Sequence, residues 1–117
     1  MNWAVKNDLY VVLNIHGDGY SSVKGGWILP QAKNQEAIRE KFAAVWKQIA
    51  DRFKDYDQHL IFESMNEIGA NIAEMKDGAT KDATIAAAYE NINAYNQIFV
   101  DTVRQSGGNN GRRFMHP

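Results

Sequence analysis

The spacing of hydrophobic and polar positions changes several times along the chain, and each change predicts a different element. Residues 9–15 are almost all apolar or aromatic, which is typical of a parallel strand buried on both faces. Residues 34–54 carry apolar side chains three or four positions apart, so an amphipathic helix is expected there, with Asn34 capping its start. Residues 2–6 are expected to be the last turn of a preceding helix.

The second half of the chain repeats this order. Residues 60–67 open as a buried strand but carry polar side chains towards their end. A loop over 68–83 is expected next, followed by a second amphipathic helix over 84–106 that a Gly-Gly pair terminates. A third strand is expected to start at about 112–115. Alternating strands and helices indicate βαβ units with a parallel sheet, so the predicted fold class is α/β.

Candidate chemistry gathers where the two predicted strands end. Ligands of parallel α/β folds bind beyond the carboxyl ends of the strands. His16 and Asp18 follow the first strand, and Asn66 and Glu67 end the second. An imidazole, a carboxamide and carboxylates should therefore meet at one edge of the sheet.

The alternation of side chains along a strand adds a second layer to this site. Asn14 shares a strand face with His16, and Glu63 shares one with Glu67. If both polar faces point the same way, Asn14 and Glu63 lie one layer below the other two and supply each other with a hydrogen bond. Glu63 would then be placed to influence the pKa of Glu67.

Composition narrows the possible function classes. The chain has 117 residues, 13 Lys and Arg against 14 Asp and Glu, and a formal net charge of −1. Without a Lys/Arg run, no nucleic-acid partner is expected. The apolar stretches are too short for a membrane span. The absence of cysteine excludes disulfide scaffolds, thiolate zinc sites and cysteine nucleophiles.

Metal and cofactor sites are not expected either. His16, Asp18 and Glu67 could be imagined as metal ligands, but no paired-ligand spacing such as His-x-x-x-His occurs. No phosphate-binding loop is present, since the Gly107–Gly111 stretch follows a predicted helix instead of preceding one. Two alternatives to an enzyme are a small non-catalytic α/β carbohydrate-binding module and a flavodoxin-like domain, although the latter lacks its phosphate loop.

Three blocks of the sequence resemble the cellulase family, glycoside hydrolase family 5. They are residues 10–20, residues 60–67, and residues 96–104 with 107–110, and they lie in the order and spacing of that family. The most specific block ends in Asn66-Glu67. The loop that contains Lys24-Gly25-Gly26-Trp27 resembles the bacterial endoglucanase branch. The resemblance covers essentially the whole chain.

This resemblance implies part of a (β/α)8 TIM barrel, from about the third strand to the start of the fifth. A complete barrel has about 250 residues. Residues 1–117 are therefore expected to be an internal fragment of a glycoside hydrolase catalytic domain. The end of the sequence at Pro117, inside a predicted strand, fits that expectation.

The resemblance also implies a retaining hydrolase that cleaves β-1,4-glucan. Glu67 would be the acid/base that protonates the leaving glycosidic oxygen and then activates water. The nucleophile would be a second carboxylate about 5–5.5 Å away, contributed by a later strand outside this chain, so the fragment alone is expected to be inactive. The polysaccharide could be cellulose, xyloglucan, mannan or mixed-linkage glucan. No cofactor is implied.

Three further residues are candidates for binding substrate. Asn66 would hydrogen-bond the sugar hydroxyl beside the scissile bond, or else close an Asx turn. His16 would orient the substrate, and Trp27 would either stack on a pyranose ring or anchor its loop. Gly17 departs from the family pattern, because close relatives often have a second histidine there. Tyr20 is a weaker stacking candidate.

The remaining aromatic and histidine residues are given structural roles. Trp3 and Trp46 are expected to pack against the core, and His59 and His116 are expected to be structural or incidental. By resemblance, the full-length parent is expected to be extracellular, although no signal-peptide pattern is visible in this segment.

Overall fold

The computed structural model describes residues 1–16, 24–68 and 78–117. Its elements alternate between helix and strand, as the sequence predicts. They are α1 (Asn2–Lys6), β1 (Val11–Leu13), α2 (Gln35–Phe53), β2 (Leu60–Glu63), α3 (Ala79–Gln105), the short 3-10 helix η1 (Gly108–Gly111) and β3 (Met115–His116).

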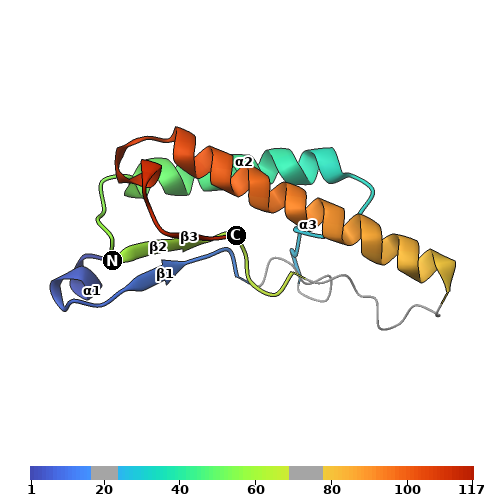
Figure 1. The fold of residues 1–117 in the computed structure, drawn as a ribbon, viewed down its shortest axis with the longest axis horizontal. Helices are drawn as coiled ribbons and strands as arrows, with labels where there is room; N and C mark the ends of the chain where they lie inside the picture. Colours follow the sequence, from blue (N-terminus) through green and yellow to red (C-terminus); the bar gives the residue numbers. More distant parts are fainter. Residues whose placement is uncertain (17–23, 69–77) are drawn as a thin grey trace.

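The three strands form one parallel sheet in the order β1-β2-β3. Val11 pairs with Leu60, and Phe62 pairs with Met115. Both long helices lie over the same face of this sheet (Figure 1). The burial of β2 alternates accordingly, with Leu60 and Phe62 fully buried and Ile61 and Glu63 only partly buried. The predicted α/β fold class is therefore confirmed.

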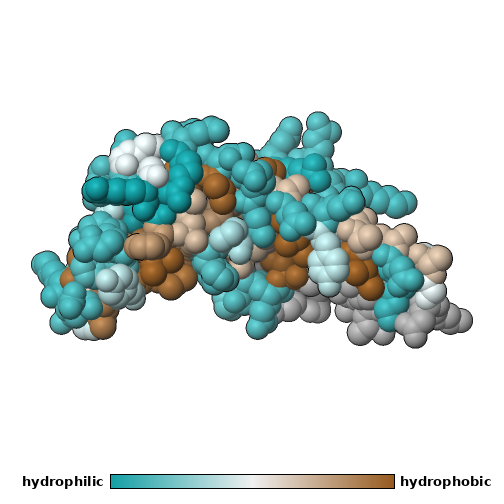
Figure 2. All heavy atoms as spheres, in the orientation of Figure 1, coloured by the Kyte–Doolittle hydropathy of each residue, from teal (hydrophilic) through white to brown (hydrophobic). Residues whose placement is uncertain are grey.

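Aromatic side chains fill the space between the helices and the sheet. Trp46 of α2 has its ring centroid 4.5 Å from that of Phe99 in α3 and 5.5 Å from that of Phe62 in β2. Phe42 lies 5.6 Å from Tyr95 in the same way. Hydrophilic residues cover the top of the molecule, where α2 and α3 run, and hydrophobic residues emerge below them (Figure 2).

Several boundaries differ from the predicted ones. The helix α3 starts at Ala79 instead of residue 84, and its first turns contain Ala79 and Ala83. Alanine favours a helix without producing an apolar stripe, so periodicity misses such turns. The strands predicted over 9–15 and 60–67 are shorter in the structure, where β1 spans 11–13 and β2 spans 60–63.

The two tryptophans predicted to pack behave differently. Trp46 is completely buried, as predicted, whereas Trp3 is 72% exposed, so the packing role expected for it is wrong in this structure. Trp3 lies on α1, a single short helix that has no buried residue. Within the described residues, no helix combines the length and the hydropathy needed to cross a membrane.

Candidate functional site

A row of polar side chains crosses all three strands near their carboxyl ends. The Asn14 amide Nδ2 donates a hydrogen bond to Glu63 Oε2 at 2.5 Å. This contact confirms the predicted pairing of these two residues. On the other side, Nδ1 of His116 lies 3.4 Å from Glu63 Oε1. One carboxylate in the central strand therefore faces the amide of the residue that directly follows β1 and an imidazole from β3.

His116 is the member of this row that sequence reasoning missed. It was expected to be structural or incidental, but it pairs with Glu63 in the β2–β3 register. The strand register could have predicted this contact, because a residue that pairs with Glu63 must lie beside it. Register across two strands cannot be read from a strand whose start is only approximately located.

The backbone that leads from β2 to Asn66 and Glu67 is held from three sides. The Trp46 indole Nε1 donates to the Ser64 carbonyl at 3.1 Å, which links this segment to α2. The Ser64 hydroxyl donates to Asn96 Oδ1 of α3 at 2.8 Å. The Asn66 backbone N–H donates to the Ile15 carbonyl at 3.0 Å. These bonds fix the segment that carries the candidate site.

Glu67 has an unusual backbone conformation. Its φ is +48°, in the left-handed region that residues other than glycine seldom adopt. Such conformations cost of order 1–3 kcal/mol and occur preferentially at functional sites. Glu67 is exposed, Asn66 is half-buried, and His16 is exposed after β1. The structure therefore brings these three candidates to the carboxyl ends of two neighbouring strands.

Trp27 packs against the core beneath its loop. It is half-buried, and its ring centroid lies 6.5 Å from that of Phe42. The Lys41 ammonium lies 4.1 Å from the Trp27 ring centroid, a cation–π contact that covers one face of the ring. This arrangement favours the loop-anchoring alternative, and stacking on a sugar stays a prediction. Gly17, Asp18 and Tyr20 lie outside the described residues.

A second cluster of charged groups lies at the opposite, amino-terminal edge of the sheet. His59, directly before β2, places Nε2 3.0 Å from Asp8 Oδ1 and Nδ1 3.0 Å from Asp57 Oδ1. The hydrogen bonds to Asp8 and then Asp57 raise the pKa of His59. The hydrogen bonds from the His59 backbone and side chain lower the pKa of Asp57. These contacts give His59 a structural role.

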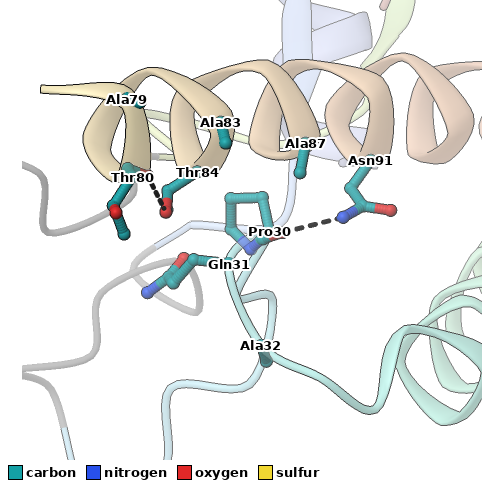
Figure 3. Close-up of a pocket in the computed structure, with 9 residues that line it drawn as sticks. All are labelled: Pro30, Gln31, Ala32, Ala79, Thr80, Ala83, Thr84, Ala87 and Asn91. Carbon is teal, nitrogen blue, oxygen red and sulfur yellow. Dashed lines mark hydrogen bonds between the residues drawn. The ribbon is translucent and has the colours of Figure 1, made fainter.

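A cavity of about 530 Å³ lies between the loop before α2 and the first turns of α3 (Figure 3). The Asn91 amide donates to the Pro30 carbonyl at 2.8 Å across one end of it. None of the described residues that line this cavity has an ionisable side chain, so they offer no acid or base. The lining residues are Pro30, Gln31, Ala32, Ala79, Thr80, Ala83, Thr84, Ala87 and Asn91.

No group of three or more His, Cys, Asp or Glu side chains in the described ranges is arranged to hold a metal ion.

A family model for cellulase, glycosyl hydrolase family 5, matches residues 1–114. The chain therefore belongs to glycoside hydrolase family 5. It is 47% identical over 115 residues to Endoglucanase A of Paenibacillus barcinonensis, and the matched region covers 98% of this chain and 27% of that protein. It is 40% identical to a xyloglucan-specific endo-β-1,4-glucanase of Bacteroides ovatus, over 96% of this chain and 20% of that protein.

Solved structures of the same family match the fold. A family 5 xyloglucanase from Paenibacillus pabuli superimposes with a TM-score of 0.84 at 52% identity, over 97% of this chain and 30% of that one. A family 5 lichenase from Caldicellulosiruptor sp. F32 gives a TM-score of 0.80 at 36% identity, with the same coverages. The three strands and their helices are part of a (β/α)8 barrel, and the chain spans about a quarter of the curated relatives' length.

Proposed function

We propose that the protein containing this chain is a retaining glycoside hydrolase of the endo-β-1,4-glucanase type, and that residues 1–117 are part of its catalytic domain. The observation that carries this proposal is the family 5 match, which extends over residues 1–114. The relatives described above support it, since their names are endoglucanase, xyloglucan-specific endo-β-1,4-glucanase, xyloglucanase and lichenase.

In this proposal Glu67 is the general acid/base. It gives its proton to the leaving glycosidic oxygen and then takes a proton from the attacking water. Its place after β2 and its positive φ support the assignment. The nucleophilic carboxylate, about 5–5.5 Å away in retaining enzymes, would come from residues outside the given sequence. The 117-residue chain on its own is then expected to be inactive.

The other candidate residues would bind the sugar. Asn66, whose backbone is tied to Ile15, would hydrogen-bond the hydroxyl beside the scissile bond. His16 would orient the substrate from the end of β1. Trp27 would stack on a pyranose ring only through the face that Lys41 leaves uncovered.

The proposed substrate is a β-1,4-linked glucan, with xyloglucan and mixed-linkage glucan as the first candidates to assay. Relatives named xyloglucanase and lichenase support that choice. The two-carboxylate mechanism needs no cofactor. Polymeric glucans do not enter cells, so the proposed site of action is extracellular, which activity in culture supernatant would test.

The acid/base role is tested in the complete gene product by replacing Glu67 with alanine. Loss of general acid catalysis is expected to lower kcat on glucan by about 10²–10⁴-fold. An aryl glycoside with a dinitrophenolate leaving group needs no proton, so its glycosyl-enzyme should still form in a rapid burst. Glu40→Ala, a matched change on the exposed face of α2, should leave both reactions unchanged.

Two results would contradict the proposal. An unchanged kcat on glucan in Glu67→Ala would show that Glu67 is not the general acid/base. Glucan binding without cleavage by the unaltered protein would favour the non-catalytic carbohydrate-binding alternative.

A further inference from the structure

Ser64 lies directly after β2, three residues before the proposed acid/base Glu67, and its side chain faces the helices. Leu60, Phe62 and Ser64 follow one another at every second position of the chain, and all three are buried. The row that packs against α2 and α3 therefore ends in a hydroxyl. A buried hydroxyl is costly unless it has a hydrogen-bond partner.

Asn96 of α3 supplies that partner. The Ser64 hydroxyl donates to Asn96 Oδ1 at 2.8 Å. Asn96 is half-buried and lies three positions before Phe99, whose ring packs against Trp46 in the core, so both residues lie on the same side of α3. This hydrogen bond therefore joins the long helix α3 to the end of the central strand.

The backbone of Ser64 is held as well. Its N–H donates to the His116 carbonyl at 2.9 Å, and its carbonyl accepts a hydrogen bond from the Trp46 indole at 3.1 Å. The two side-chain contacts, with Asn96 and Trp46, lie between the sheet and the helices, on the side away from the barrel interior. Ser64 is thus fixed relative to α2, α3 and β3 together.

The chain leaves this fixed point and reaches Glu67 in a strained conformation. The φ of Glu67 is +48°, and such a conformation persists only where the surrounding structure determines it. The Asn66 N–H, bonded to the Ile15 carbonyl, holds the chain from β1. Ser64 holds it from the helices. Without the second anchor, the backbone at Glu67 is expected to relax and to move the carboxyl group.

We propose that Asn96 is a positioning residue for the acid/base: through the Ser64 hydroxyl it holds Glu67 where its carboxyl can protonate the leaving glycosidic oxygen. This inference rests on the proposed function, because it takes Glu67 as the general acid. Asn96 does not touch the substrate in this proposal. Its loss should therefore impair proton transfer and leave glucan binding intact.

The test compares two aryl cellobiosides in the complete gene product. The phenolate of phenyl cellobioside leaves poorly without a proton, whereas dinitrophenolate needs none. Asn96→Ala is expected to lower kcat/KM for phenyl cellobioside about tenfold, as a small misplacement of a catalytic group does. It should leave kcat/KM for dinitrophenyl cellobioside unchanged. Asn96→Asp, which keeps an acceptor oxygen for the hydroxyl, should recover most of the loss.

A second variant separates positioning from stability. Asn96→Ala leaves a buried hydroxyl without its acceptor, so it should also lower the unfolding temperature. Ser64→Ala removes that hydroxyl and should be more stable, yet it should show the same selective loss on phenyl cellobioside. The double variant should lose no more than either single one, because both changes remove one contact. If Asn96→Ala does not fold, Ser64→Ala replaces it.

The control is Gln97→Ala, one position along α3. Gln97 is exposed, and its amide bonds Asp101 of the same helix at 2.9 Å. This variant should leave kcat/KM for both glycosides unchanged.

The outcomes distinguish the two proposals. Equal losses on both glycosides in Ser64→Ala, or no loss on either, would overturn the positioning role. If Glu67→Ala loses activity selectively on phenyl cellobioside and the Asn96 and Ser64 variants do not, only the inference fails. If Glu67→Ala cleaves phenyl cellobioside as fast as the unaltered protein does, or if the unaltered protein cleaves neither glycoside, both proposals fail.

Discussion

His59 connects two segments that are far apart in sequence through its two ring nitrogens. One nitrogen faces Asp8 and the other faces Asp57, each at 3.0 Å. The ring also lies against Tyr10, with centroids 5.0 Å apart. A protonated imidazole can donate to both carboxylates at once, which is why its pKa is raised by Asp8 first and Asp57 second. This cluster makes the stability of the fold depend on pH.

The sign of that dependence follows from the directions of the two pKa shifts. The raised pKa of His59 stabilises the fold fully below about pH 6.5, the ordinary value for histidine, and the contribution is lost as pH rises through the folded-state pKa. The lowered pKa of Asp57 stabilises the fold above about pH 4, and that contribution is lost as pH falls through the folded-state pKa. The two contributions overlap between about pH 4 and 6.5.

We therefore expect His59→Gln to destabilise the protein most at about pH 5–6 and progressively less above pH 7. Urea unfolding of the unaltered protein and the variant, repeated across pH 4.5–8.5, measures the difference. A difference in unfolding free energy that stays constant over this range would contradict the coupling.

Two sets of contacts show which interactions could be predicted from the sequence and which could not. The pairing of Asn14 with Glu63 could be predicted, because strand alternation and the need of a buried polar group for a partner both act locally. The role of Arg113 could not. This buried guanidinium donates to the carbonyls of Phe53, Tyr56, Asp57 and Leu60, and these contacts arise only when β3 docks beside β2.

At the scale of elements, the connection between α3 and β3 depends on one close contact of η1 with the end of α2. The 3-10 helix η1 docks on the end of α2, where the Asn109 backbone N–H donates to the Lys54 carbonyl at 2.8 Å. Gly108 has φ +59°, and a Cβ at this position would lie 2.9 Å from the same carbonyl oxygen. The Gly-Gly pair was predicted to end the helix, whereas the contact that makes one of the two glycines necessary is tertiary.

Gly108→Ala is expected to destabilise the protein by about 2 kcal/mol. Alanine is strained in the left-handed backbone conformation, and its Cβ would have to displace the Lys54 carbonyl. Gly111→Ala is the matched control. It lies in the same 3-10 helix, where a Cβ would meet nothing within 4 Å. Thermal or urea unfolding of both variants measures the difference, and equal stabilities would show that the backbone at Gly108 adapts without cost.

At the scale of the whole molecule, apolar surface is distributed unevenly. The radius of gyration is 16.0 Å, whereas a compact domain of this length has a radius of gyration of about 13 Å. The chain is therefore more extended than a compact domain and leaves more of its surface open. Val12, on the helix-free face of the sheet, is 56% exposed, and Tyr10 beside it is 63% exposed. Phe114, next to β3, is 69% exposed. Edge strands with exposed apolar side chains are templates for association with another chain.

The 117-residue chain, produced on its own, is therefore expected to associate as its concentration rises, because association covers the open sheet face and its edges. Replacing Tyr10 and Val12 with threonine should weaken this association without touching the helices. Tyr89→Thr is the control, since Tyr89 is 64% exposed on α3 and is not part of the sheet. Sedimentation velocity over a range of concentrations measures the effect. A single monomeric species with a cooperative thermal transition at every concentration would contradict this prediction. It would show that the described sheet is stable with this face open and that its edges do not cause association.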